Sequence, residues 1–182
     1  GGGLTELASA YLLEPRVADR MTAVWIGGQE YPELGAPPQP VDSTTAEYNV
    51  LIDVAAAQVV FDSDIPLWQV PRNSYRECVA SMSELMFRSR GPLGKHLYQA
   101  LIDVHSKAAC AGRKMGETFI LGDSPLVLLT ALQASFHPDP SSSRYSEVPR
   151  PRIAADGTSV PNPSGAPVRV YSSLDLRLMF ED

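Results

Sequence analysis

Apolar and polar positions follow one another along this chain in two patterns, one typical of helices and the other of buried strands. At residues 4–13 apolar side chains recur every three or four positions, which predicts an amphipathic helix that ends before Pro15. Residues 21–26 are mostly apolar and are followed by Gly27 and Gly28, which predicts a buried strand that stops at a glycine pair. A helix followed by such a strand is typical of an α/β protein with a parallel sheet.

The same two patterns predict the remaining elements. Further helices are expected at residues 53–61, 77–88, 94–110 and 124–134, and further strands at 66–70 and 168–174. Residues 29–42 and 137–166 are rich in proline and predict loops, the second with one or two short strands. Because nothing repeats and no large segment follows the second loop, we expect residues 1–182 to form a single α/β domain. Its central sheet should be mostly parallel, with helices on both faces.

Composition narrows the classes of partner and the location. The 182 residues are 44% hydrophobic and 20% charged, as in ordinary soluble globular proteins. A formal net charge of -6 argues against a nucleic acid or an anionic membrane as the partner. Two cysteines are too few for a disulfide framework, which favours a cytoplasmic location. We expect both, Cys78 and Cys110, to be buried on apolar helix faces.

The segment 43–53 carries the most informative polar pair. Glu47 and Asn49 stand two positions apart, just before an alanine-rich apolar run. In an extended segment such residues point to the same side and can reach one ligand together. A carboxylate beside a carboxamide offers the acceptors and donors that bind vicinal sugar hydroxyls. The alternative is that both residues only cap the following helix.

Two further residues are candidates for binding a cation. Asp123 follows a short apolar run and precedes a helix with Pro125 in its first turn. Its carboxylate either caps this helix or ligates a hard metal such as calcium or magnesium. Thr5 either caps the first helix or, beside a glycine-rich turn, presents its backbone carbonyl to a cation.

Other chemistry has weaker support. The three histidines, His96, His105 and His137, lack metal-ligand spacing, and the chain contains no GxSxG, P-loop, GxGxxG or CxxC motif. Residues 72–75, Arg-Asn-Ser-Tyr, follow a predicted strand, so they either border a pocket or form an ordinary loop.

Together these segments resemble the C-terminal two-thirds of the inosine–uridine-type nucleoside hydrolases. Residues 2–8 (GGLTELA) are similar to the family's G-P-L-T-N-[LI]-A, and residues 24–28 (VWIGG) to V-x-M-G-G. Residues 46–56 (AEYNVLIDVAA) are similar to A-E-F-N-x-x-x-D-P-E-A-A, and residues 65–70 to the strand that follows. Residues 121–125 (LGDSP) resemble H-D-P at the start of a late helix. The resemblance implies a Rossmann-like nucleoside hydrolase fold that is incomplete at its N-terminus.

The resemblance also implies a function. It implies calcium-dependent hydrolysis of the N-glycosidic bond of ribonucleosides, which gives ribose and free base and serves nucleoside salvage. Thr5 would be a calcium ligand through its carbonyl and Asp123 through its carboxylate, while Glu47 and Asn49 would bind ribose hydroxyls. Family members are usually dimers or tetramers, so a homo-oligomer is expected.

The chain departs from the family pattern at three functional groups. The aspartate cluster D-x-D-x-x-x-D-D, which holds the general base and most calcium ligands, is absent, and we expect it upstream of Gly1 in a longer polypeptide. The family's further ribose-binding asparagine has no match, since Asp42 is the nearest polar residue. Gly122 stands where the family has a histidine that protonates the leaving base. This chain alone is therefore a candidate for an inactive fragment.

In the first motif, Gly3 and Glu6 replace the family's proline and asparagine, which predicts a different base preference. These departures leave two alternatives open. One is a non-catalytic nucleoside-binding, ribose-binding or structural member of the same fold. The other is an unrelated α/β protein in which Glu47 and Asp123 are only helix caps.

Overall fold

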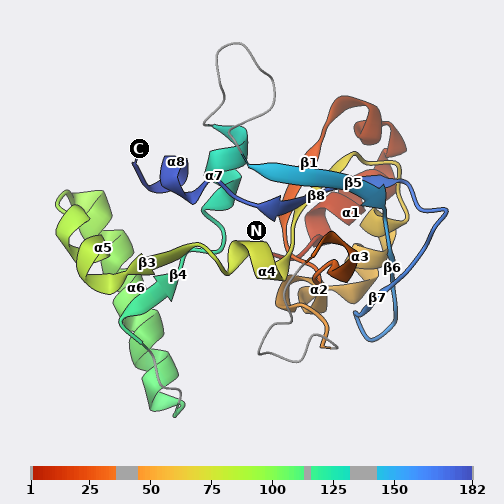
Figure 1. Ribbon diagram of the computed structural model, residues 1–182. Coiled ribbons are helices and arrows are strands. Elements are labelled where there is room, and N and C mark those ends of the chain that lie inside the picture. The colour runs from red at the N-terminus through yellow and green to blue at the C-terminus, as the bar shows by residue number, and fades with distance from the viewer. Residues whose placement is uncertain (1, 36–44, 113–115, 132–142, 182) are drawn as a thin grey trace.

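A computed structural model describes residues 2–35, 45–112, 116–131 and 143–181 of the chain. Within these ranges the main sheet has four strands in the order β1-β2-β8-β5 (Figure 1). Three of them run parallel, namely β1 (Ala23–Ile26), β2 (Leu67–Val70) and β8 (Pro167–Ser173). The fourth, β5 (Arg144–Pro149), is antiparallel to β8. The predicted mostly parallel α/β sheet is confirmed.

Helices cover both faces of this sheet. Successive residues of a strand point to opposite faces, so each face carries apolar side chains on which helices can pack. On one face the strand residues Trp25, Leu67 and Val168 belong to an apolar core that includes Ala8 of α1 (Thr5–Leu13) and Val60 of α3 (Val54–Phe61). On the other face Ile26, Val70 and Tyr171 form a second core. It includes Leu128 of α7 (Pro125–Thr130), and Leu178 of α8 (Leu176–Glu181) packs against it. The expected helices on both faces are present.

The parallel register brings the ends of β1 and β2 together. Ala23 pairs with Leu67 and Ile26 pairs with Val70, so both strands end at the same edge. Gly27 follows β1 at this edge, and its N–H donates to the Val70 carbonyl at 3.0 Å. Ligands of parallel sheets bind beyond the carboxyl ends of the strands. This edge is therefore where a site is expected.

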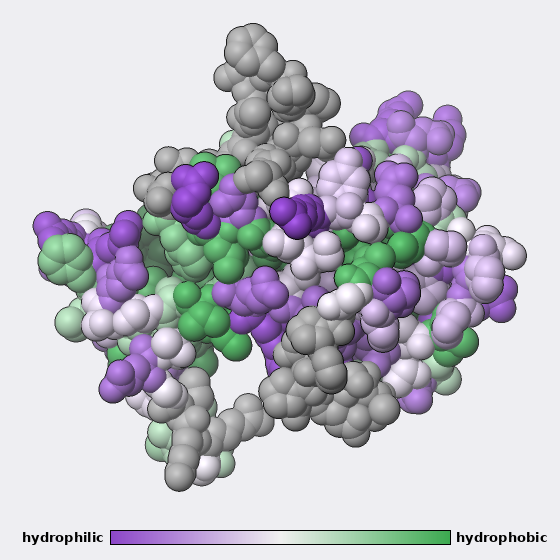
Figure 2. All heavy atoms as spheres, in the orientation of Figure 1, coloured by the Kyte–Doolittle hydropathy of each residue, from purple (hydrophilic) through white to green (hydrophobic). Residues whose placement is uncertain are grey.

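An arm extends away from the sheet (Figure 1). It consists of the antiparallel strands β3 (Val79–Ser81) and β4 (Thr118–Ile120) with α5 (Met82–Arg88) and α6 (Pro92–Cys110). Neither arm helix contains a buried residue among those described. Figure 2 shows apolar side chains gathered around α7, α8 and the base of the arm.

The remaining elements are short. They are two 3₁₀ helices, η1 (Pro15–Arg20) and η2 (Pro32–Leu34), the helices α2 (Tyr48–Ile52) and α4 (Arg72–Tyr75), and the paired strands β6 (Arg152–Ile153) and β7 (Ser159–Val160). The described part of 137–166 thus contains three strands where one or two were predicted. Across the described ranges, no helix combines the length and apolar character needed to cross a membrane.

Two sequence predictions in the arm are wrong. The helix expected at 77–88 begins only at Met82, because the preceding residues pair with β4, which lies far along the chain. Cys78 is buried as predicted, but it lies in the loop before β3 and not on a helix. Cys110 ends α6 and is exposed, and no described residue of this helix is buried. His137 and Asp42 lie outside the described residues.

Candidate functional site

The turn after β1 forms the floor of the candidate site. Gly28 has a φ of 85°, in the left-handed region that favours glycine. A Cβ at this position would also overlap the Gln69 amide. Gln69 donates from Nε2 to the Gly27 carbonyl at 2.8 Å and accepts from the Tyr31 hydroxyl at 2.7 Å. A buried polar network therefore fixes both glycines of this turn.

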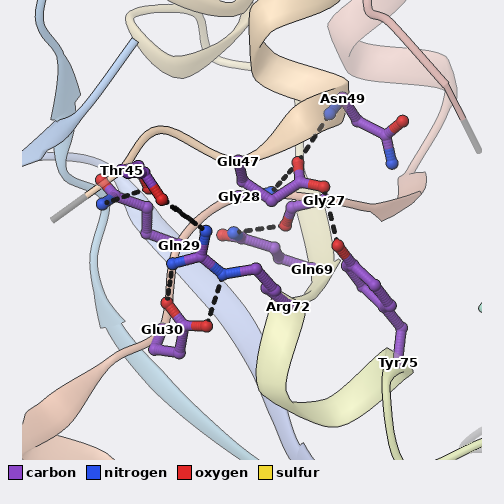
Figure 3. Close-up of polar contacts among 10 residues, drawn as sticks. All are labelled: Gly27, Gly28, Gln29, Glu30, Thr45, Glu47, Asn49, Gln69, Arg72 and Tyr75. Carbon is purple, nitrogen blue, oxygen red and sulfur yellow. Dashed lines mark hydrogen bonds and ion pairs between the residues drawn. The ribbon is translucent and has the colours of Figure 1, made fainter. Parts of the chain in front are cut away.

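Glu47 is bound tightly to this turn (Figure 3). Its side chain is buried, with 1% of the residue exposed. Oε2 accepts from the N–H of Gly28 and from the N–H of Asn49, both at 2.9 Å, and Oε1 accepts from the Tyr75 hydroxyl at 2.9 Å. Each carboxylate oxygen can accept about two hydrogen bonds. Oε2 is therefore filled, while Oε1 keeps one acceptor position.

Asn49 lies beside Glu47, but for a different reason from the one predicted. Glu47 has extended backbone and is the N-cap of α2, whereas Asn49 is within the first turn of that helix. The expectation of an extended segment is therefore wrong for Asn49. Its side chain is directed to the end of β1, where Nδ2 donates to the Ile26 carbonyl at 2.9 Å. The capping alternative holds for Glu47, which in addition contacts two other elements.

A buried ion pair holds the segment that leads to Glu47. Arg72 donates from Nε to Oε1 and from Nη2 to Oε2 of Glu30, both at 2.6 Å, and the two side chains are 5% and 6% exposed. Arg72 also donates from Nη1 to the Thr45 carbonyl at 3.2 Å. Burial raises the pKa of Glu30, but the hydrogen bonds and the charge of Arg72 together lower it by more. The pKa of Glu30 therefore lies below its ordinary value. Arg72 thus fixes residues on both sides of the 31–44 segment.

Thr5 lies at the start of α1, against α3. Its hydroxyl donates to Oδ2 of Asp53 at 2.7 Å, and Oδ1 of Asp53 accepts from the N–H of Ala56 at 2.9 Å. Those hydrogen bonds, chiefly the one from Ala56, lower the pKa of Asp53. The N-cap of α1 is Leu4, which makes no side-chain cap, so the capping alternative is wrong for Thr5.

Asp123 stands between β4 and α7 and is exposed. The N-cap of α7 is Ser124, and no side chain caps this helix, so the capping alternative is wrong for Asp123 as well. Within the described ranges its carboxylate has no hydrogen-bond or ion-pair partner. The preceding residue, Gly122, packs on the ring of Tyr75, since a Cβ there would lie 3.2 Å from Cδ2.

The four predicted residues are thus only partly brought together. Glu47 and Asn49 share the end of β1, and Tyr75 connects Glu47 to the turn that carries Asp123. In the described part of the chain, no hydrogen bond joins Thr5 to the other three. The sequence placed Tyr75 in a segment that either borders a pocket or forms an ordinary loop, and it gave no indication that this residue contacts Glu47.

The described residues do not complete a metal site. Among them, no group of three or more His, Cys, Asp or Glu side chains could hold a metal ion. Calcium takes six to eight oxygen ligands. Asp123 and the Thr5 carbonyl are two candidate donors, which is too few to hold the ion.

Comparison with known proteins shows the family. Residues 1–175 match the family of inosine-uridine preferring nucleoside hydrolases. Such hydrolases from Crithidia fasciculata and Leishmania major are each 42% identical over 69 residues, which is 38% of this chain and 19% of either relative. The chain therefore matches only about a fifth of the length of these curated relatives.

Solved structures share the fold. A plant nucleoside hydrolase superposes with a TM-score of 0.66 at 20% identity, over 98% of this chain and 57% of its own. An inosine-uridine preferring nucleoside hydrolase from Bacillus anthracis superposes with a TM-score of 0.56 at 15% identity, over 99% of this chain and 56% of its own. At these identities the likeness concerns the fold alone. From the match over residues 1–175, the chain belongs to the inosine-uridine preferring nucleoside hydrolase family.

Proposed function

We propose that this chain is the sugar-binding part of an enzyme that hydrolyses the N-glycosidic bond of ribonucleosides. The observation that carries the proposal is the Glu47 carboxylate, which is buried, held by three donors and left with one acceptor position on Oε1. A sugar hydroxyl is the donor that this position suits. Family membership supports the reaction class.

Asn49 extends the same site. One hydrogen of its amide is used by the Ile26 carbonyl, while the second hydrogen and Oδ1 remain for a ligand. An acceptor from Glu47 beside a donor and an acceptor from Asn49 is complementary to two neighbouring hydroxyls. A site built to bind a hydroxyl strongly rejects analogues that lack it, because its buried groups are then unpaired. The proposed substrates are therefore ribonucleosides rather than deoxyribonucleosides.

Calcium dependence is the second part of the proposal. The unpartnered Asp123 carboxylate supports a ligand role, with the Thr5 carbonyl as the other donor from this chain. The proposal requires further oxygen donors from outside the described residues. It also includes assembly into a homo-oligomer, which light scattering of the purified protein would test.

A non-catalytic nucleoside-binding protein of the same fold is the second candidate. The incomplete set of metal donors among the described residues favours it. The two candidates agree on Glu47 and Asn49 and differ only in whether the glycosidic bond is broken.

The test combines binding and turnover. The chain is titrated with inosine and uridine in calcium chloride, and free base is measured by chromatography. Glu47→Gln should weaken nucleoside binding by about 10- to 150-fold, as expected for a hydrogen bond to a charged group. Glu117→Gln, which removes the same charge from an exposed position in the arm, is the matched control.

The outcomes separate the candidates. Base release that EDTA abolishes supports the calcium-dependent hydrolase, and release that persists in EDTA contradicts the calcium role. Binding without base release supports the sugar site that both candidates share, because neither a general base nor a complete metal site is assigned among the described residues. A folded chain that binds no nucleoside refutes both. For the metal, Asp123→Asn should weaken calcium binding measured by calorimetry, whereas the exposed control Asp19→Asn should not.

A further inference from the structure

Tyr75 holds the one oxygen of Glu47 that remains open to a ligand. It is the last residue of α4, and its hydroxyl donates to Oε1 of Glu47 at 2.9 Å. Within the described residues it is the one side-chain donor to this carboxylate, since Oε2 is held by the backbone N–H groups of Gly28 and Asn49.

The ring of Tyr75 is held from a second direction. A Cβ on Gly122 would lie 3.2 Å from Cδ2 of Tyr75, so the ring packs directly on the turn that precedes Asp123. The position of the phenol is thus set by packing as well as by its hydrogen bond. Glu47 and the turn at 122–123 come from distant parts of the chain, and Tyr75 is the side chain that contacts both.

The phenol remains a donor at ordinary pH. Burial, followed by the charge and the hydrogen bond of Glu47, raises the pKa of Tyr75 well above its usual value of 10.0. The hydroxyl therefore keeps its proton and continues to donate to Glu47.

We infer that Tyr75 is a positioning residue that sets the direction of the free acceptor on Glu47 Oε1 and thereby selects one sugar hydroxyl of the ligand. With Oε2 fixed by two N–H groups, the carboxylate can still turn about that anchor if Oε1 is released. The phenol prevents this rotation and occupies one of the two acceptor positions of Oε1. The inference rests on the proposed function, because it takes the ligand to be a nucleoside.

Tyr75→Phe tests the inference, because it keeps the ring on Gly122 and removes only the hydroxyl. It should weaken inosine binding by about 3- to 10-fold, the effect of a typical hydrogen bond. The decisive measurement uses 2′-deoxyinosine and 3′-deoxyinosine beside inosine. Because Tyr75 acts on one hydroxyl through Glu47, the loss should vanish for the analogue that lacks that hydroxyl. Tyr98→Phe, which removes a hydroxyl from a half-buried tyrosine of the arm, is the matched control.

If Tyr75→Phe does not fold, a second variant tests the same inference. Gly122→Ala must displace the ring of Tyr75 by a few tenths of an ångström, and it should show the same selectivity among the three nucleosides.

Each outcome of these binding measurements either supports or overturns the inference. A loss confined to ligands that carry the selected hydroxyl supports the inference. An equal loss for all three nucleosides, or no loss, overturns it and leaves the proposed function standing. If the unmodified folded chain binds none of the three, the proposed function fails, and the inference fails with it.

Discussion

The buried pair between Arg72 and Glu30 makes a sharp prediction about stability. Arg72→Met replaces the guanidinium with an apolar chain and leaves the Glu30 side chain, 6% exposed in the native structure, without its cation. Two hydrogen bonds of 2.6 Å to the carboxylate and one of 3.2 Å to the Thr45 carbonyl are lost. Removing one partner of a buried ion pair costs about 3–5 kcal/mol, because the other charge stays desolvated.

Urea denaturation measures this cost. With a slope of about 2 kcal/mol per M, the midpoint for Arg72→Met should fall by roughly 1.5–2.5 M. The double variant Arg72→Met with Glu30→Leu should recover most of the loss, because neither charge remains buried. Arg88→Met is the matched control, since Arg88 pairs with Glu84 at 2.9 Å on exposed α5 and should contribute about 0.5 kcal/mol or less.

Two results would refute this reasoning. One is an Arg72→Met variant that loses no more stability than Arg88→Met. The other is a double variant that is no more stable than Arg72→Met alone. The first result would mean that the Arg72 guanidinium stabilises the fold no more than an exposed pair does, and the second that the loss does not come from the unpaired Glu30 carboxylate.

Two further predictions concern the same edge of the sheet. The folded-state pKa of Glu30 lies below its ordinary value of 4.5, so its contribution to stability is complete above that value and is lost as the pH falls through the folded pKa. The unfolding free energy of the unmodified chain should therefore fall below about pH 4.5 more steeply than that of the double variant; equal slopes would contradict this. Gly28→Ala should cost about 1–3 kcal/mol more than Gly35→Ala in thermal denaturation. Both glycines have positive φ, but among the described residues only the Cβ at Gly28 would overlap a side chain, that of Gln69. Equal losses of stability at the two glycines would contradict this, because they would show that the Gln69 side chain moves aside without a cost in free energy.

Local pattern alone was sufficient for much of the fold. The helix at 4–13, the strand stopped by Gly27 and Gly28, and the long helix of the arm lie within a few residues of their predicted bounds. Their periodicity is set by which side chains must leave water, and this is written in neighbouring residues. The strand at 79–81 was missed because its partner lies far along the chain, so no local period indicates it.

The candidate site, like the fold, was predicted from the sequence only in part. Its members Glu47 and Asn49 were identified by residue type and spacing, but the extended geometry assumed for them was wrong. A buried cation was missed entirely in the segment predicted to be a loop. Arg150 is 1% exposed and donates to four carbonyls, those of Val60, Ser63, Ile65 and Pro167.

The sequence by itself determined the class of fold, the family and the residue types available for chemistry. The tertiary structure alone decided which atoms of those residues are engaged. Glu47 owes its single open acceptor to Gly28 and Tyr75, which come from two other elements of the chain. A buried carboxylate takes its direction from whichever donors the fold places around it, and pairing between distant segments sets those donors.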